Sequence, residues 1–540
     1  MPRTPSLQCY HRIRRSTVQG WVLVITKVFR ADTLQAGAFL VQHAISLPYM
    51  PGTTVYAITA APVLNYTTVA EIANPQSDYN ATISFCNVTI SYGHQGWYDN
   101  VTVTVWLPLY GWTGRLSGIG GAGFSSLYSF TRFAPSVDIG WAAVATDAGH
   151  DHLPLTADTW ALDPAGRVNY FLLENFFASS QDEAARIGKK VCQDLYGEPP
   201  HKSYWDGCST GGRQGMLLAQ RYPDAYDGIL AGAPAINWAT FVPGMYYPQF
   251  VMNQADYYPP TCVWEAMNNA TIEACDSLDG VTDHILSLPG ECGFDPHTMV
   301  GTSISCDEGT VTINTEDAEL MVKFWEGPQY PDGSSIWYGM NKGTSPFDLA
   351  NTTCSGLNCT SGFPFTIASE WISLFVLQDT TYDLTALGAD GFAAVMNLSI
   401  SAHRALTSTD SPDLFNYRQT GGKILHWHGL ADQQIYPTGS EQYYKQVEAR
   451  DPAVRDFYRF FEAPGVNHCG ISAPSGYGLF PEDLMSVLVK WVEDGTAPDV
   501  LLASTLDGSQ QRNLCPWPQV PAYQGGDAAV AASFECADSY

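Results

Sequence analysis

Short apolar runs and amphipathic segments alternate along most of the chain. Residues 80–107 alternate apolar side chains with Thr and Asn, which predicts two antiparallel strands around a glycine-containing turn. The apolar run WAAVATDAG at 141–149 predicts a buried strand. Residues 170–197 place apolar side chains at helical intervals and end at a glycine, so they predict a helix.

The alternation continues on both sides of a long interruption. Residues 202–209 and 227–235 predict two further strands, and residues 211–224 predict the helix between them. Beyond the interruption, residues 421–429 predict another buried strand and residues 481–495 an amphipathic helix. Because strands alternate with helices, we expect an α/β fold with a mostly parallel sheet flanked by helices.

The interruption covers residues 237–420. This region is rich in Asn, Thr, Gly, Pro and Asp, and it holds six of the 13 cysteines, which predicts a loop-rich, disulfide-stapled insertion. The core domain then comprises residues 51–236 and 421–540. Residues 1–50 have a basic start and an apolar stretch that Lys27 interrupts, without a small-residue cleavage site. We interpret them as an atypical N-terminal segment, from a mis-assigned start or a degraded signal peptide, and expect them to pack poorly.

The chain is strongly acidic, with 26 basic and 54 acidic residues and a formal net charge of −28 at pH 7. Such a surface repels nucleic acid and anionic membranes, so neither is an expected partner. Thirteen cysteines and eight Asn-x-Ser/Thr sequons favour a secreted glycoprotein with oxidised cysteines. No apolar run approaches the ~18–20 residues that a membrane span requires. The sequons lie at Asn65, Asn80, Asn87, Asn100, Asn269, Asn351, Asn358 and Asn397.

A Gly-x-Ser-x-Gly frame centred on Ser209 lies between a predicted strand and a predicted helix. A nucleophilic serine on such a sharp turn needs small neighbours where the backbone crowds, and Gly207 and Gly211 supply them. The alternative is a chance match to a short pattern, which the correct flanking elements disfavour. We therefore predict that Ser209 is the nucleophile of a hydrolase.

A serine nucleophile on this kind of fold is followed along the chain by an acid and then a histidine. Asp432 comes just after the strand at 421–429, where the acid loop belongs, and His468 lies in a Gly/Pro-flanked loop before the last long helix. His468 would take the proton of Ser209, and Asp432 would orient the imidazole and stabilise its charged form. His428 precedes the acid, and we interpret it as a packed, hydrogen-bonded histidine.

Two backbone N–H groups must stabilise the oxyanion of the tetrahedral intermediate. Thr210, the residue after the nucleophile, would supply one of them. The glycine-rich stretch 114–126 would supply the other, with Gly120 and Gly121 as candidates. The alternative, a phosphate-binding loop, is disfavoured because no lysine follows at the required spacing.

Cysteines stand beside both the nucleophile and the base. If Ser209 and His468 meet, their neighbours Cys208 and Cys469 come close enough for a disulfide. That bond would hold the histidine loop on the serine turn. The competing interpretation, with Cys208 as the nucleophile, leaves Ser209 unexplained. Cys354–Cys359 and Cys515–Cys536 are the pairs that proximity predicts.

These motifs together resemble the tannase and feruloyl esterase family, which carries a Cys-Ser, Asp and His-Cys signature. Here the signature is Cys208-Ser209, Asp432 and His468-Cys469, and the resemblance runs from about residue 85 to NHCG at 467–470. It implies an α/β-hydrolase core with a large lid, formed by residues 237–420. It also implies hydrolysis of phenolic-acid esters, feruloyl or galloyl, whether small molecules or linked to polysaccharide.

Three aspartates surround a glycine turn in CDSLDGVTDHIL at 275–286. Asp276, Asp279 and Asp283 suit a hard, oxygen-liganded cation, although a solvated acidic turn has the same pattern and the spacing is not that of an EF-hand. The resemblance implies a structural Ca²⁺ in the lid, with the carbonyl groups of Val281 and Ile285 as further ligands. Of the remaining cysteines, Cys275–Cys292 is the preferred pair. The pairing of the others stays open, at Cys86, Cys192, Cys262 and Cys306.

Two other functions use the same features. A serine peptidase has the same triad, but nothing in the sequence shows a peptide-binding cleft. A binding protein on an inactive hydrolase fold is disfavoured because all three triad positions are filled. The oligomeric state has no signature in the sequence.

Overall fold

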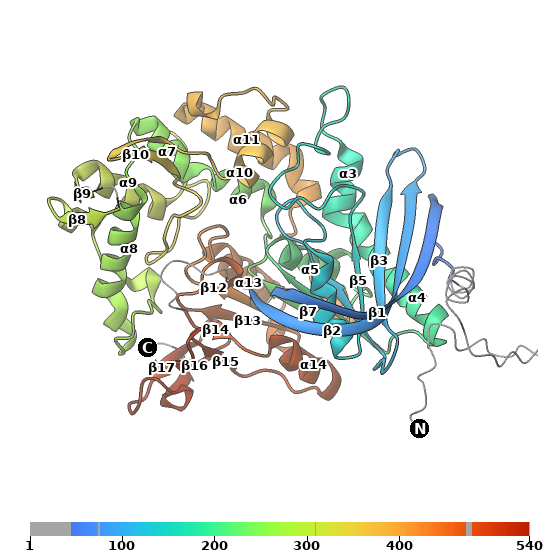
Figure 1. Cartoon of the computed structure of the whole chain (residues 1–540). Coiled ribbons are helices and arrows are strands. Elements are labelled where there is room, and N and C mark those ends of the chain that lie inside the picture. The colour runs from blue at the N-terminus through green and yellow to red at the C-terminus, as the bar shows by residue number, and fades with distance from the viewer. Residues whose placement is uncertain (1–44, 74–75, 308, 471–477, 539–540) are drawn as a thin grey trace, which may run out of the picture.

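A nine-stranded sheet forms the centre of the computed structural model, which describes residues 45–73, 76–307, 309–470 and 478–538 (Figure 1). The strand order is β1-β2-β3-β5-β4-β6-β7-β12-β13. The six strands from β5 to β13 run parallel, whereas β1, β2, β3 and β5 pair antiparallel. The strands are β1 (Thr53–Ala73), β2 (Gln76–His94), β3 (Val101–Pro108), β4 (Arg115–Ile119), β5 (Ala142–Thr146), β6 (Lys202–Cys208), β7 (Gly228–Gly232), β12 (Lys423–Gly429) and β13 (Tyr458–Ala463).

Helices pack against this sheet through their apolar residues, as in an α/β-hydrolase-like fold. Its flanking helices are α2 (Ala134–Asp138), α3 (Tyr170–Glu174), α4 (Ser180–Tyr196), α5 (Thr210–Arg221), α13 (Thr438–Arg450) and α14 (Leu484–Asp494). The helix predicted at 170–197 is α3, a π-helical turn at Asn175–Ser179, and α4 in succession. It ends at Gly197, whose φ of 83° is the left-handed conformation that favours glycine at a helix end.

The chain between β7 and β12 leaves the central sheet, and we call residues 237–420 the insertion. Its helices are α6 (Trp238–Gly244), α7 (Tyr247–Ala255), α8 (Thr261–Cys275), α9 (Thr315–Glu326), α10 (Thr366–Glu370), a π-helix (Trp371–Val376), α11 (Ala389–Thr407) and α12 (Phe415–Gln419). Two small hairpins complete it, β8 (Ser303–Cys306) with β9 (Gly309–Thr312) and β10 (Thr352–Ser355) with β11 (Asn358–Ser361). Figure 1 shows the insertion above β12 and β13.

An aromatic cluster joins the insertion to the core domain. Phe124 and Phe177 of the core pack in one buried cluster with Trp238, Trp371 and Phe375 of the insertion. Burying large aromatic side chains is among the strongest apolar contributions to stability, so this cluster fixes the insertion on the core.

The C-terminal region adds two small sheets and a disulfide. The sheets contain β14 (Phe480–Pro481), β15 (Leu501–Ser504) and β16 (Gln511–Leu514), and β17 (Val520–Tyr523) with β18 (Phe534–Ala537). The structure forms all four predicted disulfides and adds one between Cys262 and Cys306. Cys86 and Cys192 are buried free thiols.

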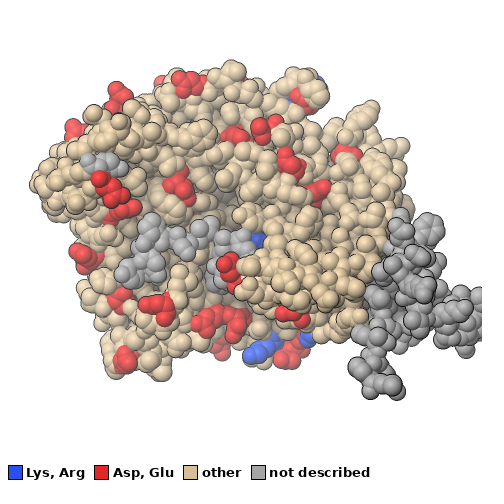
Figure 2. Space-filling model, in the orientation of Figure 1, with Lys and Arg blue, Asp and Glu red and all other residues tan. Residues whose placement is uncertain are grey.

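The prediction for the N-terminal segment divides in two. Residues 1–44 lie outside the described residues, so their packing stays a prediction. Within residues 45–50, Ile45 and Met50 are buried in the cluster that includes β2 and β3, whereas Tyr49 is 84% exposed. Among the described residues, no helix is both long and apolar enough to cross a membrane. On the face shown in Figure 2, acidic side chains are widely spread and basic ones are few.

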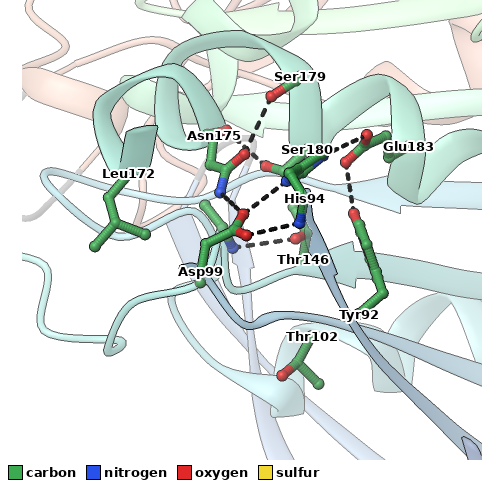
Figure 3. Close-up of polar contacts among 12 residues, drawn as sticks. Tyr92, His94, Asp99, Thr102, Thr146, Leu172, Asn175, Ser179, Ser180 and Glu183 are labelled. Atoms are coloured by element: carbon green, nitrogen blue, oxygen red, sulfur yellow. Dashed lines mark hydrogen bonds and ion pairs between the residues drawn. The ribbon is translucent and has the colours of Figure 1, made fainter. Parts of the chain in front are cut away.

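A buried network of charged groups fastens β2 to the helical segment α3–α4 (Figure 3). The imidazole of His94 bridges two carboxylates, with Nδ1 2.6 Å from Asp99 Oδ2 and Nε2 2.9 Å from Glu183 Oε1. Asn175 Nδ2 donates to Asp99 at 2.8 Å, and the Tyr92 hydroxyl donates to Glu183 at 2.7 Å. Burial alone lowers the pKa of His94, but its hydrogen bonds to both carboxylates outweigh burial and raise the pKa to about 9.

This network predicts a loss of stability at alkaline pH. Because the pKa of His94 is higher in the folded chain than its ordinary value of about 6.5, its stabilising contribution is complete below that pH and is lost as the pH rises through about 9. We expect the melting temperature of the wild type to fall between pH 6.5 and 9 more steeply than that of His94→Gln. His297→Gln, an exposed surface change, serves as the control, and equal slopes for wild type and His94→Gln would contradict the prediction.

Candidate active site

Ser209 occupies a strained turn between β6 and α5. Its φ of 62° and ψ of −122° are rare for a residue with a side chain, and such strain is characteristic of a nucleophile on a strand-to-helix turn. The backbone around Ser209 is packed so closely that the neighbouring positions have no room for a side chain. A Cβ atom on Gly207 would lie 2.4 Å from the Gly211 carbonyl carbon, so only glycine permits this approach.

The predicted acid and base form a buried pair. Asp432 follows β12 and His468 follows β13, so both lie beyond the carboxyl ends of adjacent parallel strands. His468 Nδ1 lies 2.7 Å from Asp432 Oδ2, and the side chains are 4% and 0% exposed. The pair therefore has the geometry in which a carboxylate fixes the tautomer of a catalytic histidine.

Asp432 is held by four hydrogen bonds. Its Oδ1 accepts from the backbone N–H groups of Gln434 and Ile435, and its Oδ2 accepts from His468 and from His428 Nε2 at 3.1 Å. Burial by itself raises the pKa of Asp432, but the charge of His468 and the histidine hydrogen bonds outweigh it and hold the pKa far below its usual range. The Asp432 carboxylate is therefore ionised, and it can stabilise the positive charge that His468 gains when it accepts a proton.

His428 is a packed histidine, as its position in the sequence predicts, and it also supports the acid. Its Nε2 faces Asp432 Oδ2 and the Ile435 carbonyl, and its Nδ1 lies 2.8 Å from Ser440 Oγ. Because Nε2 contacts two acceptors, it carries the proton. The sequence gives no hint of this contact, because Ser440 comes from the start of α13.

A disulfide connects the serine turn with the histidine loop. Cys208 and Cys469 are bonded, with a Cα–Cα distance of 6.0 Å across 261 residues of sequence. Ser209 Oγ forms no hydrogen bond to a described residue, and His468 Nε2 lies 3.7 Å from Cys469 Sγ. Catalytic hydrogen bonds are often long without substrate and tighten when it binds.

The predicted oxyanion donors are wrong for two of three residues. Residues 115–119 form β4 rather than a loop, so the Gly120 N–H pairs with the Asp206 carbonyl at 2.9 Å. The Gly121 N–H donates to Gln214 Oε1 at 3.0 Å. Both glycines instead allow close packing, because a Cβ on Gly120 would lie 2.6 Å from the Gly211 Cα.

Two backbone donors remain available beside the nucleophile, the predicted Thr210 and also Gly123. Among the described residues, neither the Thr210 N–H nor the Gly123 N–H has an acceptor. They lie close together, since Thr210 Oγ1 donates to the Gly123 carbonyl at 2.6 Å. The glycine-rich stretch thus supplies a candidate donor at Gly123, whereas the sequence suggested Gly120 and Gly121.

The acidic turn at 275–286 is buried rather than solvated. Asp276, Asp279 and Asp283 are 2%, 5% and 8% exposed. Asp276 accepts from the backbone N–H groups of Asp283 and His284, while Asp279 and Asp283 accept from those of Val281 and Ile285. These contacts close the turn around its aspartates.

Arg512, from β16, reaches this turn from the C-terminal region. It donates to Asp279 Oδ2 at 3.1 Å and to Asp283 Oδ2 at 2.6 Å. Burial raises the pKa of Asp283 to about 6, with the charge of Arg512 acting in the opposite direction. The guanidinium contacts two of the three carboxylates, and the four groups together carry a net charge of −2 when all are ionised. Each of the six carboxylate oxygens accepts one hydrogen bond and keeps a lone pair. Carboxylate oxygens are ligands that Ca²⁺ prefers. Among the described residues, however, no group of three or more His, Cys, Asp or Glu side chains is arranged to hold a metal ion, so the calcium site stays a prediction.

Sequence reasoning missed a half-buried carboxylate of the insertion, that of Asp348. Burial raises the pKa of this carboxyl, whereas the side chains of Gln434 and Gln433 and the charge of His468 act in the opposite direction. No motif surrounds Asp348, and only the fold brings it to the acid loop.

Known proteins match most of this chain. The sequence model described as tannase and feruloyl esterase matches residues 86–537. A protein of Arthroderma benhamiae named "Probable feruloyl esterase" is 40% identical over 506 residues, covering 92% of this chain and 93% of the relative. A tannase of Aspergillus oryzae is 29% identical over 86% of this chain and 88% of its own. The solved structure of a tannin acyl hydrolase from Aspergillus niger superposes with a TM-score of 0.83 at 28% identity, covering 93% of this chain and 94% of the other.

Proposed function

Because this chain belongs to the tannase and feruloyl esterase family, its reaction is the hydrolysis of carboxylic esters, and we propose that Ser209, His468 and Asp432 carry it out on phenolic-acid esters. The observation that supports this most is the covalent link between the serine turn and a histidine loop whose imidazole lies 2.7 Å from a buried carboxylate. Feruloyl esters are the better-supported substrates, because the relative named for them is 40% identical and the tannase 29%.

The proposed reaction proceeds through an acyl-enzyme. Ser209 Oγ attacks the ester carbonyl carbon while His468 Nε2 takes its proton, and Asp432 stabilises the imidazolium. The carbonyl oxygen becomes an oxyanion that accepts hydrogen bonds from the N–H groups of Thr210 and Gly123. The imidazolium then protonates the departing alcohol. Water, deprotonated by His468, attacks the acyl group and releases the phenolic acid and free Ser209.

Exposed sequons and disulfides support a secreted glycoprotein. Six of the eight sequon asparagines are exposed: Asn65, Asn80, Asn100, Asn269, Asn358 and Asn397. Five disulfides form among the described residues, as expected for a protein that folds in an oxidising compartment.

The function is tested by comparing wild type with Ser209→Ala on methyl ferulate, methyl gallate and a peptide amide. We expect the wild type to hydrolyse the esters, with methyl ferulate preferred, and Ser209→Ala to lose about 10⁴-fold or more in kcat because the nucleophile is gone. Ser401→Ala, on the exposed face of α11, should keep full activity. Cleavage of the peptide amide alone would identify a peptidase, and inactivity of the wild type on all three would favour a binding protein.

We also propose that the turn at 275–286 holds a structural Ca²⁺. Asp276, Asp279 and Asp283 would bind it together with the carbonyl groups of Val281 and Ile285. When bound, the ion would neutralise the two negative charges that Arg512 leaves unpaired. The role is structural, because the turn belongs to the insertion rather than to the catalytic loops.

Removal of calcium should lower thermal stability. We expect EDTA to reduce the melting temperature by about 5 °C, because a ligand that binds only the folded chain stabilises it. Excess CaCl₂ should reverse the shift. Asp276→Asn should abolish the response, whereas Asp295→Asn, an exposed change nearby, should retain it. An unchanged melting temperature in EDTA would rule out the site.

A further inference from the structure

The eight sequons differ in the residue that stands two positions before the asparagine. This residue is aromatic at two of them, with Phe85 before Asn87 and Tyr98 before Asn100. Phe85 is 2% exposed and Asn87 is half-buried, so the first ring faces the core. Tyr98 is 99% exposed, and Asn100 is exposed as well. Asn100 is therefore the sequon at which an accessible asparagine follows an accessible aromatic ring.

Tyr98 is held in a conformation that is unfavourable in two ways. Its φ is 56°, in the left-handed region that a bulky side chain rarely adopts. Its ring is also left in water, although an aromatic side chain gains more from burial than most others. Strained residues persist where the surrounding structure enforces them, and they concentrate at functional positions. The strain and the exposure at Tyr98 thus need a common explanation.

The buried network around His94 enforces this conformation from the next position along the chain. The side chain of Asp99 is 0% exposed, and it accepts hydrogen bonds from the His94 backbone N–H at 2.7 Å and from Asn175 Nδ2 at 2.8 Å (Figure 3). Asp99 is thereby fixed inward, whereas Tyr98 and Asn100 on either side of it are exposed. Two residues of chain span at most about 7 Å, so a sugar attached to Asn100 begins within reach of the Tyr98 ring.

The amide of Asn100 is oriented for modification. Its Oδ1 accepts from Ser91 Oγ on β2 at 2.5 Å, and its Nδ2 forms no hydrogen bond to a described residue. Nδ2 is the atom to which an N-linked glycan is attached. Asn351 shows the opposite arrangement, because it is half-buried and its Nδ2 donates to two backbone carbonyls.

We propose that Asn100 carries an N-linked glycan whose first N-acetylglucosamine packs on the face of the Tyr98 ring. The face of an aromatic ring carries partial negative charge, so it attracts the weakly positive C–H groups on one face of a pyranose. The contact also removes apolar surface of both rings from water. One arrangement thus accounts for the exposed ring and for the strained backbone that displays it. The inference rests on the proposed secretion and not on the esterase reaction.

Attachment of the glycan needs a lipid-linked oligosaccharide diphosphate, which the secretory pathway supplies as the second reactant. The Nδ2 atom of Asn100 forms a bond to C1 of the first N-acetylglucosamine, and the bond between C1 and the diphosphate oxygen breaks. The lipid diphosphate leaves with the bonding electron pair, and Nδ2 gives up one proton. Nothing is oxidised or reduced.

Occupancy is measured by glycopeptide mass spectrometry on protein from a secretory host that attaches high-mannose glycans. We expect the Asn100 peptide to be predominantly glycosylated. An unmodified Asn100 beside occupied sequons elsewhere would overturn the inference and leave the secreted glycoprotein in place. Absence of glycan from every sequon would overturn both.

The packing of the sugar on the ring is tested by a double-mutant cycle of Tyr98→Ala and Asn100→Gln. We expect Asn100→Gln to lower the melting temperature by about 2 °C more in the wild type than in Tyr98→Ala, because only the wild type loses the contact between sugar and ring. The bond from Ser91 is disturbed in both backgrounds and cancels. Equal effects of Asn100→Gln in the two backgrounds would contradict the packing.

Three controls separate the first sugar from other contributions. Tyr98→Phe keeps the ring and should behave as the wild type. Endoglycosidase H leaves only the first N-acetylglucosamine, so the 2 °C difference expected above should survive this treatment. Asn269→Gln removes an exposed sequon that the buried Met267 precedes, and it should have the same effect with Tyr98 or Ala at position 98. Loss of the difference in Tyr98→Phe or after endoglycosidase H would exclude the first sugar as the contact.

Discussion

The Cys208–Cys469 disulfide is the constraint on which the catalytic geometry depends. The serine turn follows β6 and the histidine loop follows β13, and β7 and β12 lie between these two strands in the sheet. Closing a loop of 261 residues restricts the unfolded chain, with a contribution of about 5 kcal/mol in chain-entropy models. Its greater consequence is local, because displacement of a catalytic group by about 1 Å reduces the rate substantially.

The electrostatics of the site converge on the buried carboxylate of Asp432. An isolated charge in this position would be very costly, and four hydrogen bonds offset that cost. Two donors are backbone N–H groups of its own loop, so the loop conformation and the charge stabilise each other. His428 and Ser440 extend the network into α13. The insertion also contacts the acid loop, because Asn341 Nδ2 donates to the Leu430 carbonyl at 3.0 Å.

The sequence predicts the residues of the site better than their contacts. Ser209 and Asp432 were identifiable because each follows a strand with a recognisable hydrophobic pattern, and His468 because it follows the acid in a Gly/Pro-flanked loop before the last long helix. Cys208 and Cys469 followed from their adjacency to Ser209 and His468. Gly120 and Gly121 were misassigned because a glycine-rich run does not reveal which N–H groups pair within the sheet. The contacts of Arg512 had no local signal, since it reaches the turn at 275–286 from the C-terminal region. The π-helical turn at Asn175–Ser179 was likewise invisible within a helical periodicity.

The most direct test of this account removes the disulfide and keeps the fold. Cys208→Ala/Cys469→Ala is compared with Cys515→Ala/Cys536→Ala, which removes a disulfide in the C-terminal region, by measuring kcat and melting temperature together. The account predicts a loss in kcat of about 100-fold for the first variant and less than about twofold for the second, at comparable losses of stability. An unchanged kcat in Cys208→Ala/Cys469→Ala would show that the triad is aligned without the disulfide and would contradict the central claim.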